Sequence, residues 1–295
     1  MSIDAYVVSA AIRRLEAEVR GPVIVFGATH LDIDLLPPLY ETLSQVGPTS
    51  RLNVVVFCRG GSVNAARRIA LLFREFTDHL CFIVPHFCES AGTVMALAAN
   101  DIIAGPLAIF SPTDPHLTAS EGPSASAPSA LSSQDVRLFR QMCQEWFGME
   151  QQQAQERALS LLSESIFPTT LASLFRCTRE VQQISNELLA LHMPDSAAEQ
   201  RARIADTLLF DFHSHTYALT RDDLARIGLP LSRNAGAEVT AWELACEIRA
   251  RTGAESRESL DGDWHDAILL TRDDGMRRRR SVDAPAAAWD AFEIR

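Results

Sequence analysis

Two short stretches of small and polar residues have the composition of a nucleophile site. Residues 58–62 contain Gly60 and Gly61, and residues 86–93 contain Ser90. Each stretch follows an apolar run and precedes apolar residues at helical spacing, so each predicts a strand-to-helix turn. Glycines at such a turn leave backbone N–H groups free to face an anion, and a serine there can present its hydroxyl to the same cleft.

Ser90 is therefore a candidate nucleophile. The backbone N–H groups of Gly61 and Ala91 would form its oxyanion hole, with Gly60 allowing a close approach. A serine at the start of a helix is also an ordinary N-cap, and a pair of glycines alone is weak support for a catalytic loop. These residues by themselves leave both interpretations open.

The base that would activate Ser90 cannot be lysine. All 27 basic residues are arginine, which excludes a Ser–Lys dyad and Schiff-base chemistry. The base must be one of eight histidines or a water-mediated carboxylate. His86 ends a predicted strand just before Ser90, where a packing role is equally expected.

His213 and His215 alternate along a strand-like segment, so their side chains should face opposite ways. Such a pair also permits a metal site, but no third ligand lies nearby in the sequence. We expect neither a metal nor another cofactor.

The elements around these residues predict an α/β core of mostly parallel strands alternating with helices. Helices are expected over residues 3–19, 32–46, 62–77 and 90–100, and strands over 22–26, 52–57, 80–84, 101–104 and 107–110. Residues 117–133 are small and polar and predict a mobile loop. About three helices should follow in residues 134–210, with breaks at Pro168 and Pro194.

The last part of the chain predicts a helix and a small hairpin extension, over residues 233–295, after a main domain of residues 1–232. The four arginines at 277–280 are expected at a solvated strand edge.

Composition narrows the function classes. The chain has 295 residues, 47% of them apolar, and a formal net charge of −11, which disfavours nucleic acid as a partner. Its six cysteines form no C-x-x-C pair. The charged N-terminal residues are unlike a signal peptide, and no uncharged run suggests a membrane segment, so a cytoplasmic protein is expected.

The order of the motifs resembles the serine dehydrogenase proteinase family, relatives of signal peptide peptidase A with the Clp/crotonase fold. The resemblance covers roughly residues 22–232. The motifs that carry it are Arg59-Gly60-Gly61, Val84-Pro85-His86, Ser90-Ala91-Gly92-Thr93, residues 96–102, residues 111–116, and Ser214-His215-Thr216-Tyr217 leading to Ile227-Gly228-Leu229.

The resemblance implies a serine endopeptidase with Ser90 as nucleophile. His215 matches the family histidine near the third triad position of Clp-type proteases, and Asp114 matches an aspartate near the place of their base. An exchange of roles gives a triad of Ser90, His215 and Asp114. His116 lies at nearly the Clp spacing from Ser90, and His86 matches a family histidine, so both remain alternatives. Asp114 could equally cap its own turn.

The chain departs from the family pattern at Arg59, Glu89 and Thr216. The first two suggest a second hypothesis: a catalytically silent scaffold or peptide-binding member of the same fold. A third is a crotonase-type acyl-CoA enzyme. The expected partners are a peptide or protein substrate and further copies of the chain, joined through residues 134–210.

Overall fold

The computed structural model describes residues 5–117, 131–252, 261–283 and 286–294. The mobile loop predicted over residues 117–133 lies, except at its two ends, outside the described residues. At those ends, β7 (His116–Leu117) pairs antiparallel with β8 (Leu131–Ser132), so His116 faces Ser132 across a short ladder.

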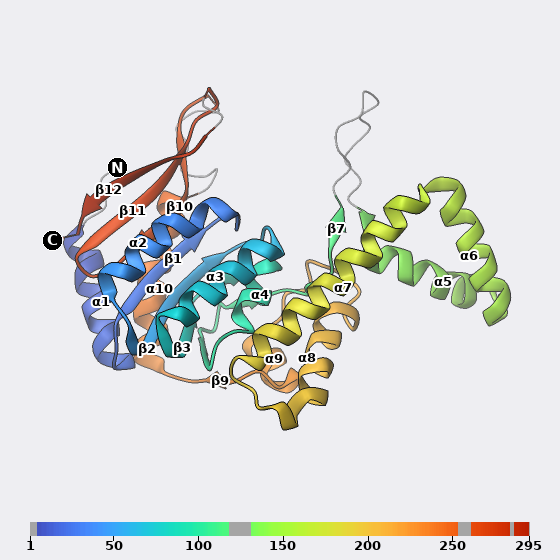
Figure 1. Ribbon diagram of the computed structural model, residues 1–295, viewed down its shortest axis with the longest axis horizontal. Coiled ribbons are helices and arrows are strands. Elements are labelled where there is room, and N and C mark those ends of the chain that lie inside the picture. Colours follow the sequence, from blue (N-terminus) through green and yellow to red (C-terminus); the bar gives the residue numbers. More distant parts are fainter. Residues whose placement is uncertain (1–4, 118–130, 253–260, 284–285, 295) are drawn as a thin grey trace.

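A mixed sheet forms the centre of the molecule (Figure 1). Its main path runs β12-β11-β10-β1-β2-β3-β5-β9, in which the neighbours among β1, β2, β3, β5 and β9 are parallel, as the α/β alternation predicts. The strands of this path are β1 (Val23–Ala28), β2 (Thr49–Cys58), β3 (Thr77–Val84), β5 (Asp101–Ala104), β9 (Leu231–Ser232), β10 (Trp264–Leu270), β11 (Asp274–Arg280) and β12 (Ala288–Glu293).

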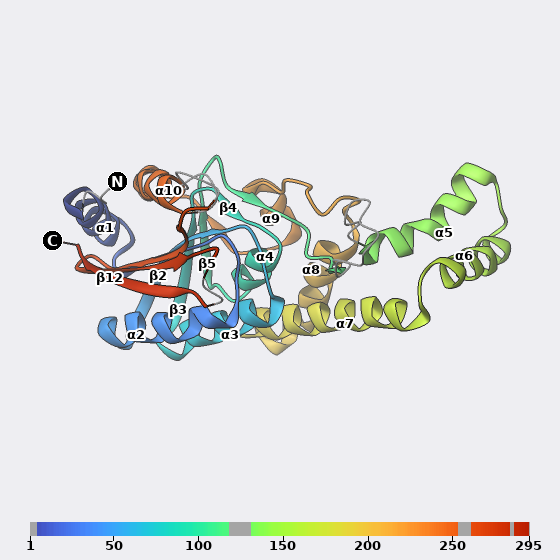
Figure 2. The ribbon, with the colours of Figure 1, turned by 90° about the horizontal axis from the view of Figure 1, so that it is seen from above.

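Helices cover both faces of this sheet (Figure 2). On one face lie α1 (Ala5–Val19) and α10 (Ala235–Arg251), and on the other α2 (Leu36–Val46) and α3 (Val63–Glu75). Two apolar clusters, one on each side, fill the space between helices and sheet. Since a parallel strand is then buried on both sides, the unbroken apolar run in β2 follows from its position.

The segment that begins at Ser133 forms an arm. It contains α5 (Ser133–Phe147), α6 (Gln151–Ser165), α7 (Pro168–Ala190) and α8 (Ala198–Phe210). The expectation of about three helices was wrong, because Gly148, with a φ of 64°, ends α5 in a left-handed cap and separates it from α6. The α5–α6 pair projects away from the sheet (Figure 1), and its small buried cluster consists of Cys143, Ala154 and Ala158.

Within the described ranges, no helix taken singly has the length and hydropathy needed to cross a bilayer. The bent pair α6–α7, with 112° between its two helices, meets the length and composition test when the two are taken together.

The C-terminal hairpin was expected and is present: β10 and β11 pair antiparallel, and β10 also pairs with β1. The arginine run, however, does not lie at a solvated edge, because β12 covers the outer side of β11. Arg278 is fully buried and forms ion pairs with Asp32 and Asp266, at 2.7 Å to each. A guanidinium can occupy such a site because two carboxylates neutralise it and accept its N–H groups.

We expect Arg278→Ala to lower the free energy of unfolding by about 3–5 kcal/mol, because it removes the buried cation between Asp32 and the buried Asp266 and leaves them only the partly exposed Arg280 as a partner. Arg279→Ala is the matched control: Arg279 has the same neighbours in sequence, is 43% exposed and pairs with Asp263 and Asp290. The Arg279 substitution should cost clearly less stability than Arg278→Ala, because ion pairs in solvent contribute little. Urea denaturation followed by tryptophan fluorescence measures both, and equal losses would contradict the structural role of Arg278.

Candidate active site

Four segments far apart in the sequence meet in a short ladder beside the main sheet. Cys58 pairs with Cys88, Cys88 pairs with Phe110, and Phe110 pairs with Leu219. These positions belong to β2, β4 (Phe87–Cys88), β6 (Ile109–Phe110) and the segment before α9 (Arg221–Ile227). Neighbouring strands lie about 4.8 Å apart, so the residues just beyond each pairing position lie close in space. Those residues include all the members of the predicted triad.

Ser90 stands on a strained turn between β4 and α4 (Ala91–Ala96). Its φ is 53° and its ψ is −116°, and in the described chain only Arg20 is another non-glycine residue with positive φ. A residue held in such a conformation costs about 1–3 kcal/mol, and strained strand-to-helix turns are typical of nucleophiles. Ser90 occupies the N-cap position, but its hydroxyl makes no capping hydrogen bond. Helix capping therefore does not explain the serine.

Two buried hydroxyl groups hold this turn. The backbone N–H of Ser90 donates to Ser111 Oγ at 2.7 Å, and Thr93 Oγ1 donates to the carbonyl of Cys88 at 2.8 Å. The N–H of Ser111 in turn donates to Thr93 Oγ1. Since Ser111 lies on the segment that leads to Asp114, these bonds fix the Ser90 turn relative to that segment.

Gly60 and Gly61 are required by space and by conformation. Their φ values are 121° and 133°. A Cβ on Gly60 would lie 3.1 Å from Ser90 Cβ, and one on Gly61 would lie 2.4 Å from the backbone nitrogen of Leu31. The glycine loop therefore lies directly against the Ser90 side chain and the backbone of Leu31.

The hydrogen bonds of Leu31 decide which way Gly61 faces. Its N–H donates to the carbonyl of Gly60, and its carbonyl accepts from Ser62. The N–H of Gly61 therefore points away from Leu31, and among the described residues it has no acceptor. The N–H of Ala91, at the start of α4, likewise has none. Two unused donors thus belong to the turns that meet at Ser90.

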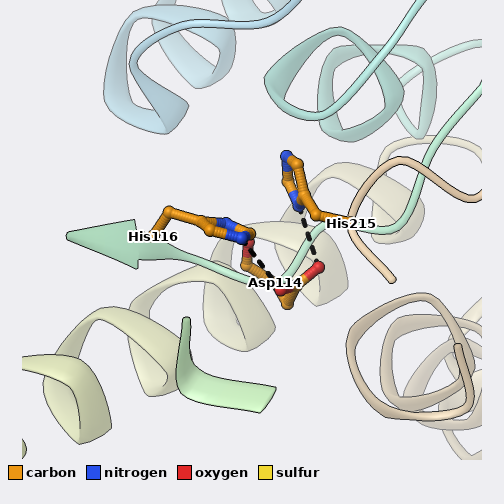
Figure 3. A group of neighbouring side chains, drawn as sticks. All are labelled: Asp114, His116 and His215. Carbon is orange, nitrogen blue, oxygen red and sulfur yellow. Dashed lines mark hydrogen bonds and ion pairs between the residues drawn. The ribbon is translucent and has the colours of Figure 1, made fainter. Parts of the chain in front are cut away.

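Asp114 and His215 are in hydrogen-bond contact. His215 Nδ1 lies 2.9 Å from Asp114 Oδ1, and Figure 3 shows the other ring nitrogen of His215 directed away from the carboxylate. Asp114 is 2% exposed and also accepts from Ser132 Oγ at 3.0 Å. Among the described residues neither His215 nor His116 hydrogen-bonds to the Ser90 hydroxyl, and such bonds are often long in free enzymes.

The surroundings of Asp114 favour its charged form. Burial is the largest single effect and raises the pKa of this carboxyl, but the hydrogen bond and charge of His215, the hydrogen bond from Ser132 and the charge of His116 together outweigh it, so the pKa lies below its usual value. Asp114 is therefore ionised at neutral pH and can orient an imidazole through its Nδ1–H.

The other two candidate histidines have different neighbours. His116 lies against His215, with ring centroids 4.1 Å apart, and its Nδ1 is 3.1 Å from the carbonyl of Asp114. His86 stacks instead on Phe87 and faces Trp242 of α10, and burial lowers its pKa. His86 contacts none of Asp114, His116 and His215 in the described structure, so the packing alternative considered for it has direct support.

Glu89, beside the nucleophile, is half-buried. Burial raises the pKa of its carboxyl, whereas Arg59 and His215 act in the opposite direction. Arg59 lies over the Phe87 ring, with its guanidinium carbon 3.9 Å from the centroid. The net result is a pKa of Glu89 above its usual value.

Sequence reasoning overlooked several residues that position the site. Ser111 and Thr93 were noticed as parts of motifs, but nothing in their types indicated that they hold the Ser90 turn. Leu31 was not considered, although it fixes the direction of the Gly61 N–H. Their roles depend on pairing between distant segments, which periodicity cannot indicate.

The mixed α/β architecture, with a serine on the strained turn after β4, is similar to that of the Clp/crotonase-like folds. Residues 42–137 match the family of ClpP-like SDH-type serine proteinases, which confirms the resemblance inferred from the motifs. The matched stretch includes the glycine loop, Ser90, Asp114 and His116, and it ends before His215.

Two curated relatives come from Methanocaldococcus jannaschii. The uncharacterized protein MJ0137 is 25% identical over 65% of this chain and 58% of its own length. The uncharacterized protein MJ1495 is 24% identical over 64% of this chain and 54% of its own length. The match thus spans little more than half the length of either relative.

Solved structures that resemble the chain include a probable enoyl-CoA hydratase/isomerase from Mycobacterium abscessus, with 12% identity and a TM-score of 0.33 over 75% of this chain and 66% of that one. A putative enoyl-CoA hydratase from Streptomyces coelicolor A3(2) gives 15% identity and a TM-score of 0.33, over 77% and 68%. Likeness of this size does not bear on function.

Proposed function

We propose that this chain is a serine endopeptidase in which Ser90 is the nucleophile, His215 the general base and Asp114 the residue that orients the base. The observation that carries the proposal is the 2.9 Å hydrogen bond between His215 Nδ1 and the buried carboxylate of Asp114. It joins two residues that the sequence separates widely, in the relation that triad chemistry requires. The match to a serine proteinase family supports the same chemistry.

The reaction would follow the usual two steps of acyl transfer. Ser90 Oγ attacks the peptide carbonyl while its proton moves to Nε2 of His215. The Nδ1–H of that ring keeps its hydrogen bond to Asp114. The N–H groups of Gly61 and Ala91 donate to the oxyanion. His215 then gives its proton to the leaving amine. In the second step the same ring takes a proton from water, which attacks the acyl carbonyl, and returns it to Ser90 Oγ as the new carboxylic acid leaves.

The substrate would be an extended segment of a peptide or protein. Gly61 turns its backbone N–H and carbonyl away from Leu31; the N–H would serve the oxyanion, and the carbonyl is free to accept from the main chain of another strand. A peptide that adds to this edge would be held through its main chain, with little demand on its side chains.

The choice of base is tested by His215→Ala and His116→Ala. We expect His215→Ala to lower the rate of peptide cleavage about 10³–10⁴-fold, since the general base is lost. His116→Ala should lower it less than tenfold, because the bond between Asp114 and His215 remains. The rates of peptide cleavage and of fluorophosphonate labelling of Ser90 are measured for both variants. Equal losses of rate in the two variants, or a larger loss in His116→Ala, would contradict the exchanged triad.

A silent scaffold remains the second candidate, on the single observation that an ionisable Glu89 adjoins Ser90. Glu89→Met restores the family residue. This candidate would be favoured if the wild type took up no fluorophosphonate and the Glu89→Met variant were labelled. Retention on CoA resin without labelling would instead favour the crotonase-type enzyme.

We also propose that copies of the chain associate through the helical arm. Trp146 is 76% and Phe147 64% exposed at the end of α5, and Phe167 is 81% exposed at the start of α7. The α5–α6 pair has only a small buried cluster of its own. Exposed aromatic side chains on such a pair of helices are typical of an interface. A second copy of the same arm would provide the matching apolar surface.

The arm prediction is tested by sedimentation at micromolar concentration. Wild type should sediment as a species larger than the 32.5 kDa monomer, and Trp146→Glu should shift it toward the monomer. Tyr40→Glu is the control, because Tyr40 is 56% exposed on α2, away from the arm. A wild-type monomer would contradict the proposed association.

A further inference from the structure

Asp114, His116 and His215 form a group with the composition of a metal site. Their ligand atoms all lie within 4.8 Å of one another. Figure 3 shows the three side chains directed toward one another. Asp114 is buried, while the two imidazoles are 27% and 28% exposed and reachable from solvent. The sequence suggested a possible metal pair in His213 and His215, but the structure gives His215 other partners.

The orientation of His116 is the second observation. Its Nδ1 lies 3.1 Å from the backbone carbonyl of Asp114, so that Nδ1–H donates there. In the neutral ring, Nε2 then carries a lone pair, and this atom faces Asp114 Oδ2 at 3.8 Å, beyond hydrogen-bond range. Two lone pairs facing each other repel, and a cation between them removes that repulsion. Histidines that bind metals are commonly oriented by such a bond from their other nitrogen.

The donor set selects the metal. Two imidazole nitrogens and one carboxylate oxygen suit Zn²⁺ better than Mg²⁺ or Ca²⁺, which prefer oxygen ligands. Zinc–ligand bonds of 2.0–2.2 Å place two tetrahedral ligand atoms roughly 3.3 Å apart. The separation between His215 Nδ1 and Asp114 Oδ1 is 2.9 Å and that between His116 Nε2 and Asp114 Oδ2 is 3.8 Å, so the two lie on either side of that value. Small movements of partly exposed rings would therefore complete the site and leave a fourth position for water.

We propose that Asp114, His116 and His215 bind a Zn²⁺ ion that inhibits the enzyme, an inference whose inhibitory part rests on the proposed peptidase function. The inhibition follows from the tautomer of His215. Zinc on Nδ1 takes the lone pair of that nitrogen, so the single ring proton must lie on Nε2. A protonated Nε2 cannot accept the proton of Ser90 Oγ, and Asp114 no longer orients the ring. Loss of the metal restores the active tautomer.

Metal binding is measured first, without reference to activity. The full chain, free of any histidine tag and carrying Cys246→Ser to remove an exposed thiol, is titrated with zinc chloride by calorimetry. We expect one zinc per chain, and an affinity at least 10–100-fold lower in His116→Ala. His213→Ala is the matched control, because this exposed histidine lies outside the group, and its affinity should be unchanged. Unchanged affinity in His116→Ala would overturn the site.

Inhibition is measured by fluorophosphonate labelling of Ser90. Zinc should slow the labelling of the wild type at least tenfold, EDTA should restore it, and His116→Ala should respond at least tenfold less to the same zinc concentration. Zinc that binds at the site without slowing the labelling would overturn the inhibition. Metal-free wild type that is not labelled would overturn the peptidase proposal and the inhibition with it, whereas the calorimetry would still decide whether the metal site exists.

Discussion

Ser90→Ala is expected to abolish covalent labelling by fluorophosphonates and to lower peptide cleavage by about 10⁴–10⁶-fold. The hydroxyl is the proposed nucleophile, and no other group on the turn can replace it: burial raises the pKa of the neighbouring Cys58 thiol to about 12 and that of Cys88 as well. The substitution should change the free energy of unfolding by less than about 1 kcal/mol, since the Ser90 hydroxyl caps no helix.

Ser62→Ala provides the opposite control. Ser62 starts α3 on the neighbouring glycine loop, and its hydroxyl accepts from the N–H of Ala65 at 3.3 Å. Its removal should lower stability by about 0.5–2 kcal/mol and leave Ser90 open to labelling. Mass spectrometry of the labelled peptide, with urea denaturation of both variants, separates the two roles. Full cleavage activity in Ser90→Ala would eliminate Ser90 as nucleophile.

The parts of the fold set by local pattern were predictable. Short apolar runs predicted β1, β2 and β3, and Gly60–Gly61 and Ser90 stand at the two strand-to-helix turns where the pattern placed them. The Gly148 break in the arm was missed because a glycine inside a helical pattern is compatible both with a continuous helix and with a left-handed cap. Only the packing of α5 against α6 distinguishes the two.

Relations between distant segments were not predictable in the same way. The burial of Arg278 depends on β12 covering β11 and on Asp32 approaching from the loop after β1, and no periodicity in the arginine run indicates either. Likewise, the approach of His215 to Asp114 depends on the pairing of Phe110 with Leu219, a bridge of two backbone hydrogen bonds. The resemblance to a family suggested the residues, whereas the ladder explains why they meet. Their catalytic roles stay predictions.

The role of Asp114 has the sharper test, because Asn has the same shape. We expect Asp114→Asn to lower the rate of peptide cleavage about 10⁴-fold with little change in the fold. An amide can donate to His215 Nδ1, which would leave the ring proton on Nε2, the nitrogen that must accept the Ser90 proton. The carboxylate charge that would stabilise the imidazolium is also lost. Cleavage rates measured in EDTA keep bound metal out of the comparison.

Ser132→Ala is the matched control for Asp114→Asn. It removes the other side-chain hydrogen bond to Asp114, from Ser132 Oγ to Oδ2, and leaves the His215 bond to Oδ1 in place. Ser132 also caps α5, so the variant should lose about 1 kcal/mol of stability, yet its cleavage rate should fall less than tenfold. If Ser132→Ala and Asp114→Asn lost activity equally, Asp114 would be acting through its hydrogen bond with Ser132, and not by fixing the tautomer of His215. A cleavage rate in Asp114→Asn close to that of the wild type would remove Asp114 from the catalytic machinery altogether, and with it the assignment of His215 as the oriented base.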